Sequence, residues 1–245
     1  MRVTLSVLLF FALSRPLIAA AESMFQDANQ LYQNGKYSEA ASIYEDLLQK
    51  KEVPEVYYNL GNAYFKDQKL GSAILSYERA LKLSPRDRDV RANLTYANRL
   101  IEYKIEDKRN WSVKLVSCAL GYISLKECWL VALVSYMIFI SVSVIFLLIQ
   151  RRLVFGKLGV ATLSFAIVCA LVTFLKQTNF GEGQPAIVTE ETVEVRYGPA
   201  ASDRLAFRMV EGLKVFVTDT KPGWYRLELR DRQTGWVPQS GVTLV

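Results

Sequence analysis

Residues 54–85 have the sequence PEVYYNLGNAYFKDQKLGSAILSYERALKLSP, which is the clearest helical pattern in the N-terminal part of the chain. Apolar and small residues recur in it at alternating spacings of three and four, which is the period of an α-helix. Pro54 opens the stretch, and Ser84-Pro85 closes it, because proline disfavours helix in the residue before it. We therefore predict two helices with a turn at Gln68 between them.

The same pattern occurs 33 residues earlier, where Tyr44 corresponds to Tyr77. Small residues recur where two helices must approach closely, and aromatic residues recur where a large side chain fills the gap between units. A third start follows, because residues 90–94 (VRANL) echo residues 56–60 (VYYNL). We expect it to form one long closing helix from residue 87 to about residue 103.

The repeated pattern resembles a tetratricopeptide repeat, in which each unit is a pair of helices. The positions of the second unit that match the family are Tyr57, Leu60, Gly61, Tyr64, Ala73, Tyr77, Ala80 and Pro85. The resemblance implies an all-α repeat domain over residues 22–103, with Gly35 and Gln68 in the turns of the two units. At least three units are usually needed to bury a continuous core, so we expect a partner or a membrane-proximal helix to complete this domain.

The resemblance also implies a protein-binding groove, lined by the first helix of each unit. Asn29 and Asn62 hold positions where some members bind a peptide backbone, because an amide offers both a donor and an acceptor. The alternative is that these two asparagines only satisfy local packing. Phe25 and Ala92 stand where carboxylate-binding members keep lysine, so recognition of a terminal carboxylate is not expected. The groove positions carried over are Phe25, Asn29, Tyr32, Tyr58, Asn62, Phe65, Lys66, Tyr96 and Arg99.

Two uncharged stretches, residues 128–150 and 158–175, predict transmembrane helices. Three basic residues in the intervening loop, residues 151–157, place that loop in the cytoplasm. The connector before the first span, residues 104–127, begins with charged residues. It continues with an apolar segment, residues 111–122, which either forms an interfacial helix or packs against the repeats.

The N-terminus, residues 1–21, is typical of a secretory signal peptide, with Arg2 at its start, an apolar core and three alanines before Glu22. The alternative is an uncleaved membrane anchor. The signal peptide and the basic loop independently place the N-terminal and C-terminal domains on the same side of the membrane. We therefore predict a bacterial inner-membrane protein with two spans and with both domains in the periplasm.

The C-terminal region changes to a period of two residues, which is typical of β-strands. A linker, residues 176–184, precedes it, and five short strands are predicted within residues 185–245. We expect these strands at residues 186–189, 192–196, 213–217, 224–229 and 235–237. Five short strands in so small a segment predict a small all-β barrel.

This segment resembles a bacterial SH3-like domain, through residues 193–199 (VEVRYGP), 210–212 (VEG), 224–227 (WYRL) and 235–237 (GWV). Eukaryotic relatives bind polyproline helices on aromatic side chains, and some bacterial relatives are associated with cell-wall peptides. The candidate ligand surface here is Tyr197, Trp224, Tyr225 and Trp236. The alternative is that Trp224 and Trp236 belong to the core, because a small domain needs bulky residues to build one.

The composition speaks against catalysis. The chain of 245 residues has no histidine and three cysteines, none of them in a C-x-x-C spacing. The commonest general base and zinc ligand is therefore missing, and we expect no catalytic residue, no metal and no cofactor. The net charge is +6, but residues 22–110 are balanced and residues 177–245 are slightly acidic, so no nucleic-acid surface is expected.

The order of signal, repeats, membrane hairpin and SH3-like domain resembles the aerotolerance-operon BatE family of bacterial membrane proteins. That resemblance implies an adaptor that works with von Willebrand factor A-type membrane proteins and a MoxR-type ATPase in envelope stress tolerance. The first hypothesis is thus a non-enzymatic scaffold that recruits a protein through the repeats. The alternative is a cell-wall sensor or tether that binds peptidoglycan peptides through the SH3-like domain.

Overall fold

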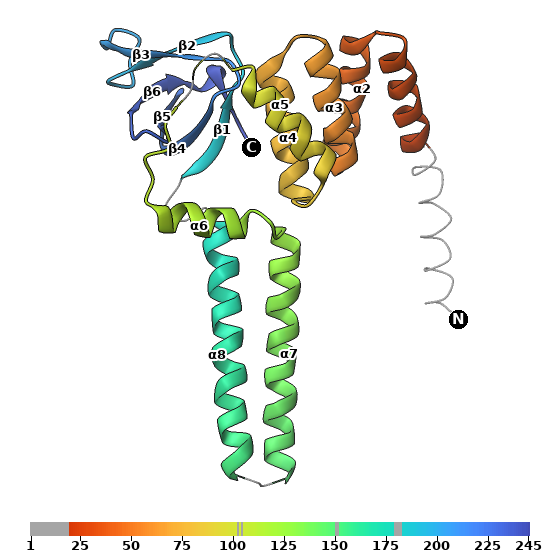
Figure 1. Cartoon of the computed structure of the whole chain (residues 1–245), viewed down its shortest axis with the longest axis vertical. Helices are drawn as coiled ribbons and strands as arrows, with labels where there is room; N and C mark the ends of the chain where they lie inside the picture. The colour runs from red at the N-terminus through yellow and green to blue at the C-terminus, as the bar shows by residue number, and fades with distance from the viewer. Residues whose placement is uncertain (1–19, 102, 104, 150–151, 179–182) are drawn as a thin grey trace.

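The computed structural model describes residues 20–101, 103, 105–149, 152–178 and 183–245. Figure 1 shows a head, in which a helical domain and a β-sheet lie side by side, above a long hairpin of two helices. A short helix, α6 (Trp111–Leu120), lies across the junction between the head and the hairpin. The predicted signal peptide, residues 1–21, falls outside the described residues except for its last two.

The helical domain consists of the predicted repeats. Residues 20–33 are helical and are followed by α2 (Tyr37–Lys50), α3 (Pro54–Lys66), α4 (Leu70–Leu83) and α5 (Arg88–Arg99). The core holds alternating small and aromatic residues as expected: Ala28, Ala40, Tyr44, Ala63, Ala73, Tyr77 and Ala80.

Gly61 shows why a small residue is needed between α3 and α4. A Cβ atom at this position would lie 2.6 Å from the ring of Tyr77, whose side chain is fully buried. The turns between the paired helices are equivalent as well, because Gly35 (φ 78°) and Gln68 (φ 62°) both adopt the left-handed conformation. Residues 33 positions apart therefore have the same backbone conformation and the same place in the packing of the helices.

The closing helix is shorter than predicted. The carboxylate of Asp87 accepts hydrogen bonds from the backbone of Asp89 (3.0 Å) and Val90 (3.1 Å), so α5 begins where expected. It ends at Arg99, several residues before the expected Tyr103. The chain turns away there because Ile101 packs into the cores of both the helical domain and the sheet.

The hairpin consists of α7 (Leu125–Ile149) and α8 (Arg152–Gln177). Each contains an apolar stretch of 21 residues that is long enough to cross a membrane, and most of its side chains are exposed. Both helices extend beyond the predicted spans, and residues 152–157, predicted as loop, already belong to α8. The physical reason is that arginine and lysine end an apolar span but are good helix formers.

The C-terminal domain is an antiparallel sheet of seven strands in the order β3-β2-β6-β5-β4-β1-β7. The strands are β1 (Gln184–Val188), β2 (Thr192–Arg196), β3 (Leu205–Val210), β4 (Lys214–Lys221), β5 (Trp224–Glu228), β6 (Thr234–Pro238) and β7 (Val242–Leu244). The prediction of five strands missed β3 and β7. β3 lacks a clean alternation, since only Met209 is buried in it, and β7 has three residues.

The edge strands of the sheet are β3 and β7. The sheet nevertheless curls around a single core. Val193 of β2 and Val242 of β7 belong to the same buried cluster. Gly241, just before β7, lies so close to β2 that a Cβ atom there would be 2.8 Å from the side chain of Val193. This curvature gives the domain the compact, barrel-like core that the strand pattern predicts.

The two soluble domains share a boundary that the sequence did not reveal. Ile187 of β1 is fully buried, and it belongs to the core of the helical repeats. Val245 also packs against that core. The sheet therefore supplies part of the packing that two and a half repeats need, a role that we had expected from a partner or a membrane-proximal helix.

Candidate functional site

The candidate groove lies on the first helix of each helical pair, and a network of hydrogen bonds holds its polar residues. The Asn62 side-chain oxygen accepts hydrogen bonds from the Tyr77 hydroxyl (2.7 Å) and from the Asn93 amide (2.9 Å). This arrangement joins α3, α4 and α5 at one point. Burial of Tyr77 raises the pKa of its hydroxyl, which therefore stays protonated as a donor.

The first repeat contains an equivalent network. The Asn29 side-chain oxygen accepts from the Tyr44 hydroxyl (2.6 Å) and from the Asn59 amide (3.2 Å). Burial raises the pKa of Tyr44 to about 12. Among the described residues, the amide nitrogens of Asn29 and Asn62 donate no hydrogen bond within the chain. Each asparagine thus supports packing through its oxygen and can offer its nitrogen to a peptide carbonyl.

Aromatic residues flank these asparagines. The rings of Phe65 and Tyr96 lie 5.7 Å apart, and Tyr96 is 57% exposed at the end of this row. In the first repeat, the ring centres of Phe25 and Tyr44 lie 6.0 Å apart, and the ring of Tyr32 contacts that of Tyr37 edge-on with 5.3 Å between their centres.

The remaining groove positions are Tyr58, Lys66 and Arg99. The ring centre of Tyr58 lies 6.2 Å from that of Tyr77, and its hydroxyl oxygen lies 3.4 Å from the Asn93 amide nitrogen. Lys66 and Arg99 are exposed. Such a surface, aromatic with a few amides and cations, suits an extended or helical peptide.

The four aromatic residues proposed for the SH3-like ligand surface have different environments. Tyr197 is 67% exposed, beyond the end of β2. Trp236 is buried, and the Lys221 ammonium lies 5.0 Å from the centre of its ring. Trp224 and Tyr225 are half-buried on β5. Trp236 therefore serves the packing of the sheet, and Tyr197 is the aromatic side chain most available to a ligand.

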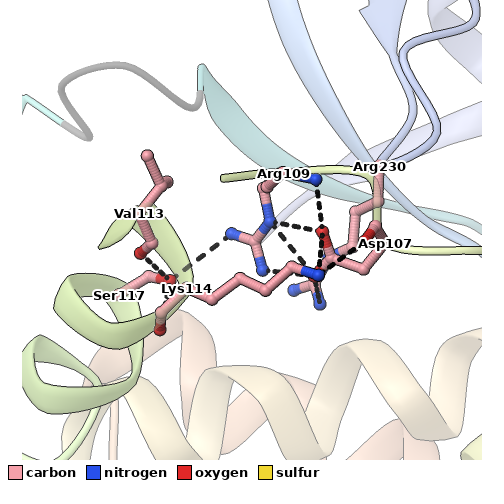
Figure 2. Close-up of polar contacts among 6 residues, drawn as sticks. All are labelled: Asp107, Arg109, Val113, Lys114, Ser117 and Arg230. Carbon is pink, nitrogen blue, oxygen red and sulfur yellow. Dashed lines mark hydrogen bonds and ion pairs between the residues drawn. The ribbon is translucent and has the colours of Figure 1, made fainter. Parts of the chain in front are cut away.

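A polar cluster in the connector was missed at the sequence level (Figure 2). Asp107 pairs with Arg109 (2.7 Å) and with Arg230 of the sheet domain (3.5 Å). Lys114 of α6 donates to the Asp107 carbonyl oxygen at 2.6 Å, and Ser117 lies 3.4 Å from the Arg109 guanidinium. The hydrogen bonds from Arg109 hold the pKa of Asp107 well below its usual range. The charged connector was visible in the sequence, but its partner Arg230 lies more than a hundred residues away.

Polar contacts also bind the sheet to α4. The Glu211 carboxylate accepts a hydrogen bond from the backbone nitrogen of Gly71 (2.6 Å), at the start of α4. Lys214 pairs with Glu78 at 2.7 Å, and both side chains are largely buried. These contacts, with the buried Ile187, join the repeats and the sheet into one head.

Leu244 and Val245 pack against the same helix. Arg79 donates to the Leu244 carbonyl oxygen (2.7 Å), and Lys82 donates to a main-chain oxygen of Val245 (2.9 Å). A pocket of about 310 Å³ lies beside these contacts, with Glu52 and Tyr57 also in its lining. The two cationic side chains in its lining, Arg79 and Lys82, already donate hydrogen bonds to backbone oxygens. The pocket is therefore part of the boundary between the two domains.

No group of three or more Cys, Asp or Glu side chains that could hold a metal ion occurs within the described residues. Cys118, Cys128 and Cys169 are free thiols.

Comparison with known proteins supports both domains. Residues 54–87 match the family model of the tetratricopeptide repeat, and residues 189–243 match that of the bacterial SH3 domain. No curated protein matches the chain. Among solved structures, the chain is similar to the C-terminal SH3 domain of myosin IB from Entamoeba histolytica, with 22% identity over 25% of this chain and 93% of that chain. The TM-score of 0.17 is too low to carry an argument.

The chain therefore combines a helical, tetratricopeptide-like N-terminal region, two apolar helices that could span a membrane, and an antiparallel SH3-like sheet. Domains of these two families are typically binding modules without catalytic activity. The resemblance to the BatE family as a whole stays a prediction.

Proposed function

We propose that this chain is a non-enzymatic adaptor, anchored in the bacterial inner membrane, that recruits a partner protein through the groove of its helical repeats. The observation that carries the proposal is the row formed by Phe65 and Tyr96 beside the amide of Asn62. Phe65 packs partly against the core, hydrogen bonds from Tyr77 and Asn93 hold Asn62, and Tyr96 is exposed beside Phe65. Side chains that are already held in place can contribute binding energy at a small cost in entropy.

The proposed partners are von Willebrand factor A-type membrane proteins and a MoxR-type ATPase complex, in envelope stress tolerance. The proposal places both soluble domains in the periplasm. The basic residues near the turn of the hairpin support that orientation, since cytoplasmic loops carry an excess of arginine and lysine.

The binding test is a photo-crosslinking amino acid at position 96 in the full chain, followed by mass spectrometry of the captured proteins. We expect capture of a membrane-associated partner, and its loss in the variant Phe65→Ala. A matched control is Leu81→Ala on α4, a helix outside the row. Equal capture by Phe65→Ala and by the unaltered chain would remove the groove from the proposal.

The orientation test is a pair of alkaline phosphatase fusions, one after Gln184 and one after Arg152. Because this enzyme folds only in an oxidising compartment, we expect activity in the first fusion and none in the second. Activity in the second fusion would place the turn of the hairpin outside the cytoplasm and contradict the proposed localisation.

A second candidate function is a tether that binds peptidoglycan peptides through the SH3-like domain, favoured by the exposure of Tyr197. Co-sedimentation of the full chain with purified cell-wall sacculi tests it. Binding that is lost in Tyr197→Ala and retained in Phe65→Ala would favour the tether over the recruiting groove.

A further inference from the structure

Helix α6 has two chemically different faces. Its polar side chains Lys114 and Ser117 point toward the connector cluster, where they contact Asp107 and Arg109 (Figure 2). Since residues three apart lie on the same side of a helix, these two contacts fix the rotation of α6 about its own axis. One face of α6 is therefore committed to the head.

The other face is mostly apolar, with Ser112 as its polar member, and has no partner in the described part of the chain. Trp111 is 79% exposed, Leu115 is 62% exposed and Val116 is 56% exposed, and α6 contains no buried residue. Exposure of these side chains to water is unfavourable, because a large apolar side chain gains free energy when it leaves water. Large apolar side chains exposed together on one side of a helix indicate an interaction site.

The position of α6 identifies what this face meets. α7 begins at Leu125, only a few residues after α6 ends. At the same level, the ammonium group of Lys176, at the end of α8, donates to the carbonyl oxygen of Leu120 (2.5 Å) and to that of Ile123. The C-terminal end of α6 is thus tied to the ends of both apolar spans, and α6 extends sideways from there (Figure 1).

We infer that α6 lies in the lipid headgroup region, with Trp111, Leu115 and Val116 inserted into the boundary between headgroups and acyl chains. The inference rests on the proposed membrane insertion of α7 and α8. A bilayer that covers the spans Leu125–Ile145 and Lys157–Gln177 must reach the level of Lys176, and it then meets the free apolar face of α6. Helices with an apolar face and a tryptophan commonly lie in this region.

This placement gives the head a defined orientation on the membrane. The head is joined to α6 through Asp107 and Arg230, and α6 is joined to the hairpin through Lys176. A lipid surface in contact with α6 would be the third contact of this helix, after those with the head and with the hairpin. The recruiting groove would then be presented at a constant height and angle above the bilayer.

Tryptophan fluorescence of the full chain in liposomes tests the inference. The liposomes contain phosphatidylcholine brominated either near the headgroup or near the end of the acyl chain, and bromine quenches only tryptophans that it contacts. Three variants, Trp111→Phe, Trp129→Phe and Trp224→Phe, assign the quenching by difference from the unaltered chain. Trp129 on α7 reports insertion of the hairpin, and Trp224 on strand β5 is the control outside α6 and the two apolar spans.

We expect Trp111 to be quenched to a similar extent as Trp129 by lipid brominated near the headgroup, less by lipid brominated near the chain end, and Trp224 to be unaffected. Quenching of Trp129 without quenching of Trp111 would overturn the inference and leave the membrane anchor intact. Absence of quenching at both positions would overturn the inference and the proposed membrane insertion together.

A second measurement replaces the apolar face by charge. We expect Leu115→Glu to lower the quenching of Trp111 and leave that of Trp129 unchanged, because a carboxylate costs free energy when it leaves water. Since Leu115 is exposed, this substitution should not unfold the head. Unchanged quenching of Trp111 in Leu115→Glu would contradict contact between this face and lipid.

Discussion

At the scale of single residues, Asn62 has a structural role within the proposed groove. Its oxygen accepts hydrogen bonds from Tyr77 and Asn93, and its nitrogen donates none within the described residues, so it is the atom proposed to meet a ligand. A buried hydroxyl that loses its acceptor pays the cost of leaving water without compensation. The asparagine is therefore part of the folded framework before any peptide binds.

Asn62→Ala is expected to lower the free energy of unfolding of the helical domain by about 1–3 kcal/mol, because the buried Tyr77 hydroxyl loses its acceptor. Urea unfolding of the full chain in detergent micelles, followed by circular dichroism, measures this change. Lys66→Ala on the same helix is the control, since an exposed side chain typically changes stability by less than about 0.5 kcal/mol. A stability equal to that of the control would show that the hydrogen bonds contribute little.

Gln68 adopts a backbone conformation that is unfavourable for its residue type. It occupies the turn position at which the first repeat has Gly35, and its φ of 62° is unfavourable for a residue with a Cβ atom. The repeat geometry fixes this conformation, because α3 and α4 must pack as closely as the helices of the first unit.

Gln68→Gly is expected to raise the free energy of unfolding by about 0.5–1 kcal/mol, because relief of the left-handed strain exceeds the entropy cost of glycine. The same change inside a helix, Gln30→Gly, is the control and should lower it by about 1 kcal/mol. Thermal unfolding of the three proteins side by side checks the opposite signs. Two shifts of the same sign would contradict the strain at Gln68.

At the scale of elements, α4 depends on a residue from another domain for its N-terminal cap. Its N-cap residue, Lys69, makes no side-chain hydrogen bond to the helix. The Glu211 carboxylate instead accepts from the Gly71 nitrogen, and its negative charge lies at the positive end of the helix dipole. The docking of the sheet and the stability of α4 are thus linked.

Glu211→Ala is expected to destabilise the head by about 1 kcal/mol and to increase amide hydrogen exchange in the first turn of α4, because the helix loses its cap. Hydrogen exchange with mass spectrometry measures the second effect. Glu190→Ala is the control, since Glu190 is exposed in the β1–β2 turn. Faster exchange confined to the sheet domain, with α4 unchanged, would argue against the capping role.

At the scale of the whole molecule, the connector cluster determines how the head sits on the hairpin. Asp107 is bound on one side by Arg109 and Lys114, and on the other side by Arg230 of the sheet. These contacts depend on the ionised carboxylate, because its pKa is lowered by hydrogen bonds that only the charged form accepts fully.

The cluster predicts a dependence on pH. Because the folded-state pKa of Asp107 is lowered, its contribution to stability is present above the unfolded pKa of about 4 and is lost as the pH falls toward the folded value. We expect Asp107→Asn to be less stable than the unaltered chain at pH 7, with a difference that shrinks below about pH 4. Melting temperatures of both proteins from pH 3 to pH 7 check this. A difference that stays constant down to pH 3 would contradict the role of the carboxylate charge.

Much of the fold could be predicted because its causes are local. Alternation of small and aromatic residues predicted the paired helices, and uncharged runs predicted the hairpin. The third strand of the sheet was missed, since strand β3 (Leu205–Val210) has no clear alternation and is defined by its pairing with β2. The groove positions could be carried over from the repeat pattern, but the sequence could not show that the oxygens of Asn29 and Asn62 are already used.

Periodicity and composition within a few turns of chain were enough to predict the paired helices, the two apolar spans and five of the seven strands. The packing of the domains alone shows that Ile187 completes the core of the repeats, that Glu211 caps α4 and that Arg230 meets Asp107. Each of these contacts joins residues far apart in the chain. Short-range patterns carry no information about them, because they form only when packing brings the domains together.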